Sequence, residues 1–158
     1  MAMNRLDAAF KEVWVGDVPV AGFASPFAGD EFAAMIAVFT RVPFVEKDRL
    51  ARSLIHQGCR YAVCAGVECD DWESAFDDVD VEQHPEGEAS RFVMTTSHKG
   101  EALETVAEFL FMCTAIEKKV PERFVVLLVG AEGAHREAVR ETVTRVLASL
   151  PNPVVGWR

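Results

Sequence analysis

Four apolar segments of strand length, each followed by a segment with helical periodicity, constrain the fold of this chain more than any other feature. Segments that are apolar throughout, rather than at alternate positions, are typical of parallel strands covered by helices on both faces. The pattern predicts an α/β fold: a three-layer open sandwich of about four mainly parallel strands, Rossmann-like but without a dinucleotide motif. The predicted strands are residues 32–39, 61–65, 91–96 and 124–129, and the predicted helices are residues 46–57, 72–79, 101–116 and 134–150.

These repeated units divide the chain into three parts. Residues 1–29 form an N-terminal arm, in which Leu6, Phe10 and Val13 at helical spacing predict a short helix from Asn4 to about Glu12. Residues 30–150 form the α/β domain, and residues 151–158 form an extended C-terminal tail. A chain of 158 residues buries enough surface for one core without a disulfide or a structural metal.

The net charge of −9 argues against nucleic acid and against an anionic membrane surface as partners. Both are bound mainly through clustered Lys and Arg. No apolar run approaches the roughly 20 residues of a membrane span, and Asp7 and Glu12 interrupt the start of the chain where a signal peptide would be apolar. Together with four cysteines that suit reduced thiols, these features predict a cytoplasmic protein.

The segment from Glu68 to Glu88 contains ten acidic residues and no Lys or Arg. One interpretation is a solvated helix followed by an acidic loop, which is what charge runs usually form. The other is a docking surface for a basic protein partner, because acidic patches select partners of complementary potential. In that interpretation Asp77, Asp78 and Asp80 contact the partner.

In an open parallel sheet, ligands bind outside the carboxyl ends of the strands. The corresponding loops here are residues 40–41, 66–71, 95–101 and 130–133. The candidate catalytic residues in them are His98 and Cys69, and the candidate ligand-binding residues are Glu68, Asp71, Thr96 and Glu101.

His98 carries an imidazole, which suits a general base or a ligand. It would pair with a Cys69 thiolate at a helix start if their strands are neighbours, although the acids around Cys69 disfavour a thiolate. The competing interpretation is structural: Ser97 or His98 caps the next helix and Glu101 completes a capping box.

A metal site is a further alternative. Glu68, Asp70, Asp71 and His98 offer ligands for Mg²⁺ or Mn²⁺, although the two Asp side chains suit the first turn of a helix equally well. The spacing of five between Cys59, Cys64 and Cys69 does not match zinc sites, and residues 130–133 lack a phosphate-binding motif. We therefore predict no cofactor.

Several short segments resemble one family. They are Cys59-Arg-Tyr-Ala-Val63, Glu68-Cys69 followed by Trp72, Phe92-Val-Met-Thr-Thr-Ser-His98 and Glu101-Ala-Leu-Glu104. The chain resembles, over residues 31–130, an uncharacterised bacterial domain family of unknown function, most distinctively in the Met94-Thr-Thr-x-His98 pattern. An aromatic residue often stands in that family where this chain has Ser97. The resemblance implies a small cytosolic α/β domain and no particular activity.

Two classes of function follow from these observations. The first is a binding or regulatory domain that docks a basic protein partner. The alternative is a small hydrolase, or a metal- or ligand-binding enzyme, with its site at the carboxyl ends of the strands. The strand order is open at this point, and an exposed sheet edge would favour a homodimer.

Overall fold

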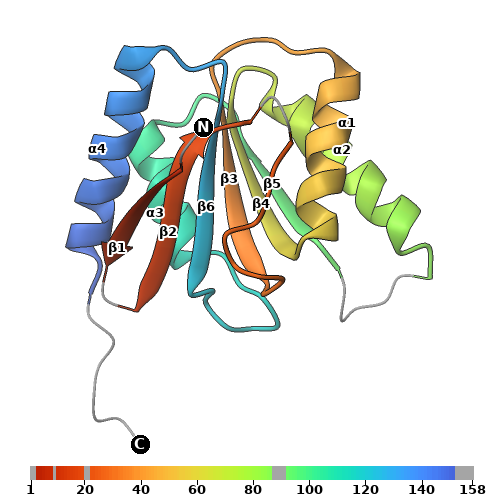
Figure 1. Ribbon diagram of the computed structural model, residues 1–158, viewed down its shortest axis with the longest axis horizontal. Helices are drawn as coiled ribbons and strands as arrows, with labels where there is room; N and C mark the ends of the chain where they lie inside the picture. The colour runs from red at the N-terminus through yellow and green to blue at the C-terminus, as the bar shows by residue number, and fades with distance from the viewer. Residues whose placement is uncertain (1–2, 9, 20–21, 87–91, 152–158) are drawn as a thin grey trace, which may run out of the picture.

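Six strands form one mixed, mostly parallel sheet, in the order β1-β2-β6-β3-β4-β5 (Figure 1). The computed structural model describes residues 3–8, 10–19, 22–86 and 92–151. Within them β1 is antiparallel to β2, and all other neighbours are parallel. The predicted α/β class is confirmed, and the four predicted strands correspond to β3–β6. The strands are β1 (Asn4–Ala8), β2 (Lys11–Asp17), β3 (Phe32–Val38), β4 (Cys59–Gly66), β5 (Met94–His98) and β6 (Arg123–Val129).

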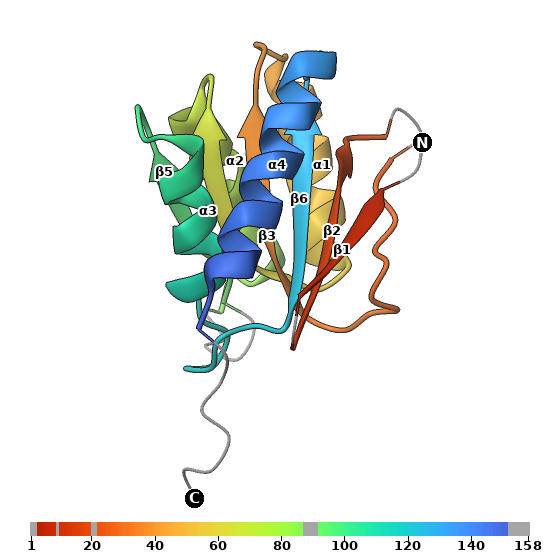
Figure 2. The same ribbon diagram turned by 90° about the vertical axis from the view of Figure 1, so that its left-hand side faces the viewer.

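Four helices pack against this sheet: α1 (Phe44–His56), α2 (Cys69–Gln83), α3 (Leu103–Met112) and α4 (Gly133–Ser149). Helices α1 and α2 cover one face, and α3 and α4 cover the other (Figures 1 and 2). Strand β3 is buried along its whole length because its side chains alternate between these faces. Ala34 and Ile36 belong to the core under α1 and α2, whereas Ala33 and Met35 belong to the core under α3 and α4. Burial on both faces explains the continuous apolar sequence of this strand.

The helix predicted from Asn4 to Glu12 is wrong, because this segment contains a pair of antiparallel strands. Strand β2 adds to the sheet in parallel beside β6, with Val13 opposite Phe124. Val13 and Val15 are buried, and Trp14 between them packs on the opposite face. The period of two, stabilised by pairing with β6, therefore prevails over the helical spacing of the apolar residues.

The third predicted strand begins later than its apolar sequence suggests. The N–H of Val93 donates to the Asp80 carboxylate at 3.3 Å, and the carbonyl of Phe92 accepts a hydrogen bond from Arg60 at 3.0 Å. Side chains thus occupy these backbone groups just before β5 begins at Met94. His98, expected in a loop, is the last residue of β5.

Beyond Pro151, the predicted extended tail lies outside the described residues. No helix in the described part of the chain is long and apolar enough to cross a membrane.

The topology fixes one special position at the carboxyl end of the sheet. Strands β3 and β6 are neighbours, but the chain leaves β3 for α1 on one face and leaves β6 for α4 on the other. Adjacent connections that diverge in this way leave a crevice, which is where open α/β sheets bind ligands.

Candidate functional site

His98 is a buried side chain whose two ring nitrogens are both engaged. Its Nδ1 lies 2.8 Å from the Glu101 carboxylate and its Nε2 lies 2.9 Å from the Thr96 hydroxyl. The ring also packs against Phe109 of α3, with 4.5 Å between centroids. A neutral ring satisfies both contacts by donating to Glu101 and accepting from Thr96. The structure therefore brings together three predicted site residues in an arrangement that ties β5 to the start of α3.

Cys69 lies on the opposite face of the sheet from His98. It is buried at the start of α2, where its Sγ lies 3.3 Å from the Oγ of Ser97, and the Ser97 hydroxyl donates to the Asp70 carboxylate. Because successive residues of a strand point to opposite faces, Ser97 meets α2 whereas His98 meets α3. The two strands are neighbours as the dyad required, but the sheet separates the thiol from the imidazole and no Cys69–His98 pair forms.

Glu68 and Asp71 surround a buried cation on α1. Lys47 is 4% exposed, and its Nζ lies 2.7 Å from the Glu68 carboxylate and 3.9 Å from that of Asp71. Arg41 approaches the other oxygen of Glu68 at 3.9 Å. The hydrogen bond from Lys47 lowers the pKa of Glu68. This ion-paired cluster joins α1 to the connection between β4 and α2.

These carboxylates do not form the divalent-metal site considered above. Across the described ranges of the chain, no group of three or more His, Cys, Asp or Glu side chains is arranged to hold a metal ion. Glu68 faces an ammonium, and His98 lies across the sheet from Asp70. The same residue types that suggested a metal are therefore placed by ion pairing and by the strand pleat.

The acidic segment forms a row of carboxylates along the side of α2 that faces β5. Asp70 accepts from Ser97 at one end of this row, and Asp80 accepts from the N–H of Val93 at the other. Glu73 and Asp77 lie between them at helical spacing. We call Asp70, Glu73 and Asp77 the acidic row.

The three residues predicted to contact a partner differ in their exposure. Asp77 and Asp78 are exposed, but Asp80 is only 7% exposed. Its carboxylate binds the ring of His84 at 2.9 Å as well as the backbone of Val93. Asp80 is therefore a structural group that is not available to a partner, because helical periodicity turns it toward the chain preceding β5.

The acidic row carries a local excess of negative charge. Within the described residues Asp70, Glu73, Asp77 and Asp78 form no ion pair, whereas Glu82, farther along α2, binds Arg52 of α1 at 2.8 Å. Burial, and then repulsion by neighbouring carboxylates, raise the pKa of Glu73 and that of Asp77. The row is thus a surface on which a cation would relieve an existing repulsion.

A separate cavity of about 640 Å³ occupies the crevice beside β3 and β6. Phe23, Leu50 and Leu128 supply apolar lining, and Arg49 and Arg136 lie among the polar lining residues. Arg136 is held by Asp17 at 2.9 Å, whereas Arg49 forms no ion pair with a described residue. Thr40, Gly130 and Ala131 of the strand-end loops also line this cavity, but the sequence does not reveal it, because β2 and the strand order complete its walls.

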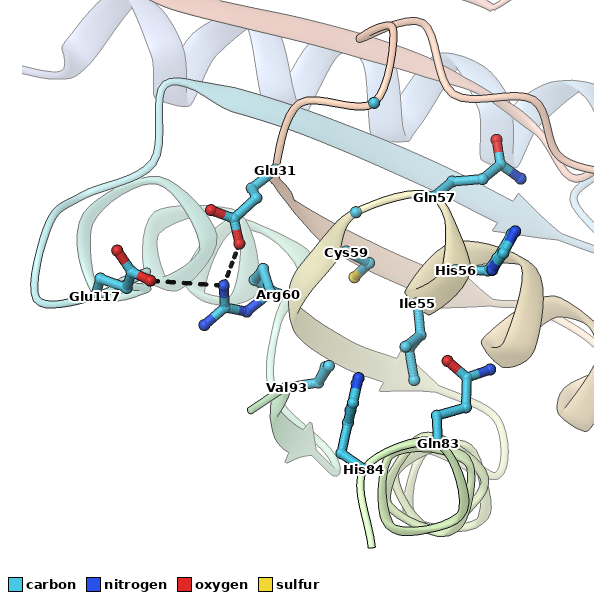
Figure 3. A pocket seen from close by; sticks show the side chains of 12 residues that line it. Glu31, Ile55, His56, Gln57, Cys59, Arg60, Gln83, His84, Val93 and Glu117 are labelled. Carbon is cyan, nitrogen blue, oxygen red and sulfur yellow. Dashed lines mark hydrogen bonds and ion pairs between the residues drawn. The ribbon is translucent and has the colours of Figure 1, made fainter. Parts of the chain in front are cut away.

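Another cavity, of about 480 Å³, lies at the amino end of β4 (Figure 3). Arg60 extends between Glu31 and Glu117, and its guanidinium contacts both carboxylates, the second at 3.9 Å. His56 and His84 lie on the α1 and α2 side of the same cavity. Its cation is already paired, and it lies at the opposite end of the strands from the crevice.

The fold and these surfaces define an α/β domain with a mostly parallel sheet and two distinct candidate binding regions. The chain belongs to the family described as Domain of unknown function (DUF7684), which matches residues 16–146. This match confirms the resemblance to an uncharacterised domain family. No curated protein and no solved structure matches the chain.

Proposed function

We propose that this protein is a binding domain that docks a basic protein partner on α2. The observation that carries the proposal is the acidic row, in which Asp70, Glu73 and Asp77 are aligned without an ion pair from the described residues. Lys or Arg side chains of a partner would supply the missing cations. Such complementarity accelerates association and discriminates against acidic competitors.

Two further features support a binding role over a hydrolytic one. His98 is only 6% exposed and its ring nitrogens contact Thr96 and Glu101, which leaves little of the imidazole accessible to a substrate. Cys69 has no imidazole partner, since the sheet lies between the two side chains. The thiolate–imidazole pair that would support nucleophilic catalysis by Cys69 is therefore missing from this arrangement.

The proposal includes a setting and a finer description of the fold. Cys59, Cys64 and Cys69 are buried free thiols, which supports a reducing compartment such as the cytoplasm. Helices on both faces of a mostly parallel sheet support a Rossmann-like, three-layer arrangement.

Binding of a fluorescein-labelled oligolysine peptide, followed by fluorescence anisotropy, tests the proposal. The variant Glu73→Gln with Asp77→Asn removes two charges from the acidic row and should weaken binding by about tenfold. The matched control, Asp48→Asn with Glu82→Gln, removes two charges beside Arg52 and should leave affinity within about twofold. Equal affinity of the wild type and the acidic-row variant would refute the proposal.

The cavity beside β3 and β6 supports a second candidate function, the binding of a small amphipathic anion. Its apolar lining would hold the body of such a ligand, and Arg49 would face the anion. Anilinonaphthalene sulfonate is a suitable probe. Its fluorescence should rise to saturation as it is titrated into the wild type and into Arg140→Gln, a control variant on α4, but not with Arg49→Gln. Unchanged titrations with both variants would exclude this cavity as the binding site.

A further inference from the structure

We infer that the basic partner docks as an extended segment that pairs with the free edge of β5, with cationic side chains toward α2 and apolar side chains toward α3. The inference rests on the proposed function and specifies how its surface is used. It gives the partner a definite chemistry: alternating basic and apolar residues over the length of one short strand.

Strand β5 is at an edge of the sheet. It is last in the strand order and, in the ranges of the chain that the structure describes, pairs only with β4. An edge strand presents alternate backbone N–H and C=O groups outward, which is the basis of recognition by strand addition. Residues 94–98 include no Lys or Pro, the residues that commonly protect such an edge.

The α2 side of this edge is acidic. Thr95 and Ser97 point toward α2, since Ser97 contacts Cys69 and Asp70 there. The acidic row runs along the helix beside them. Side chains two residues apart on an added strand are separated by about 7 Å, and carboxylates one turn apart on a helix by about 5–6 Å. Successive basic residues of the added strand therefore match successive members of the row.

The α3 side of the same edge combines an exposed apolar side chain, Met94, with the polar residues Thr96 and His98, and Glu101 binds His98 at its end. Met94, Thr96 and His98 share this face, and the ring of Phe109 packs on His98. Met94 is 44% exposed although it is opposite the buried Tyr61 in the sheet. Residues of the added strand that alternate with its basic positions would cover this exposed apolar surface.

A second copy of this chain fits the edge less well than a basic segment. Antiparallel pairing of β5 with its own copy, about a two-fold axis perpendicular to the sheet, would place both α2 helices on the same face. The two acidic rows would then approach each other and repel. Charge complementarity thus selects the basic segment.

Labelled heptapeptides test this inference by anisotropy. An alternating Lys-Val peptide should bind about tenfold more tightly than a peptide with the same residues in two blocks. Only the alternating sequence places all Lys side chains on one face of an extended strand and all Val side chains on the other. Two further alternating peptides carry N-methyl groups on all Lys or on all Val residues. Since the N–H groups of alternate residues point to the same edge of a strand, only one of these two should lose binding.

The outcomes separate the inference from the proposed function. If alternating, blocked and both N-methylated peptides bind equally, and the Glu73→Gln, Asp77→Asn variant still weakens them, strand addition is overturned while docking by charge stands. If no lysine peptide binds, both are overturned. If light scattering and a β5 cross-link show a dimer through β5, the inference is overturned in favour of a second copy.

Discussion

Gly66, the last residue of β4, offers the sharpest test of how the carboxyl end of the sheet is built. It has a φ of +91°, and a Cβ added there would lie 2.1 Å from the carbonyl oxygen of Val38, far inside the 3.4 Å of ordinary contact. That same oxygen accepts the N–H of Val67 at 2.9 Å. Ala at position 66 must therefore push β4 away from β3 and lengthen this hydrogen bond.

The cost of Gly66→Ala in free energy of unfolding is the sum of two contributions. Positive φ in an Ala residue costs about 1 kcal/mol, and loss of the backbone hydrogen bond with displacement of the strand end adds about 2 kcal/mol. At about 2–4 °C per kcal/mol for a chain of this size, Gly66→Ala should lower Tm by about 6–12 °C.

Gly100→Ala is the matched control for this prediction. Gly100 has a φ of +72° but no atom within 4 Å of the added Cβ, so only the conformational cost of about 1 kcal/mol applies. Thermal unfolding followed by circular dichroism compares the two variants. Equal losses of Tm would refute the reasoning that contact with Val38, rather than backbone conformation, requires glycine in β4.

Three other outcomes follow from the acidic helix and the thiols. Burial and neighbouring carboxylates raise the pKa of Glu73, so the folded protein binds the carboxyl proton more tightly than the unfolded chain and loses stability as the pH rises through this pKa. Glu73→Gln should therefore raise Tm at pH 7. An equally large gain at pH about 4 or below, where the carboxyl group is protonated, would contradict this explanation. Burial raises the pKa of Cys59 to about 12, whereas Cys113 is exposed, so a thiol reagent at pH 8 should react rapidly with Cys113 alone. Rapid labelling that persists in the Cys113→Ser variant would contradict this prediction. Asp80→Asn weakens one buried and one partly buried hydrogen bond and should cost about 1–3 kcal/mol in urea unfolding. Asp78→Asn on the exposed side should change stability by less than about 0.5 kcal/mol, and similar costs for the two variants would refute the structural role of Asp80.

The α/β class and the approximate places of four strands and four helices can be predicted from local sequence alone. Segments such as Phe32–Val38 are apolar at every position because both faces of the strand are covered, and this property is visible without knowing what covers them. The acidic character of α2 was equally visible, since charge is a property of composition. The ion pair of Glu68 was not visible in the sequence, because its buried partner, Lys47, lies 21 residues earlier in the chain.

Which residues contact each other depends on how distant segments pack. The segment containing Val13 became a strand because β6 was available to pair with it, although its spacing alone also fits a helix. His98 and Cys69 were predicted at one edge, but the pleat of β5 placed them on opposite faces. Asp80 has the same acidic character as its exposed neighbours in the sequence, but its position on the helix places it against the backbone of Val93. Local sequence encodes the periodicity of apolar residues. Strand pairing, the face to which a side chain points and its burial depend on contacts between segments far apart in the chain, and those contacts decide which side chains can act together.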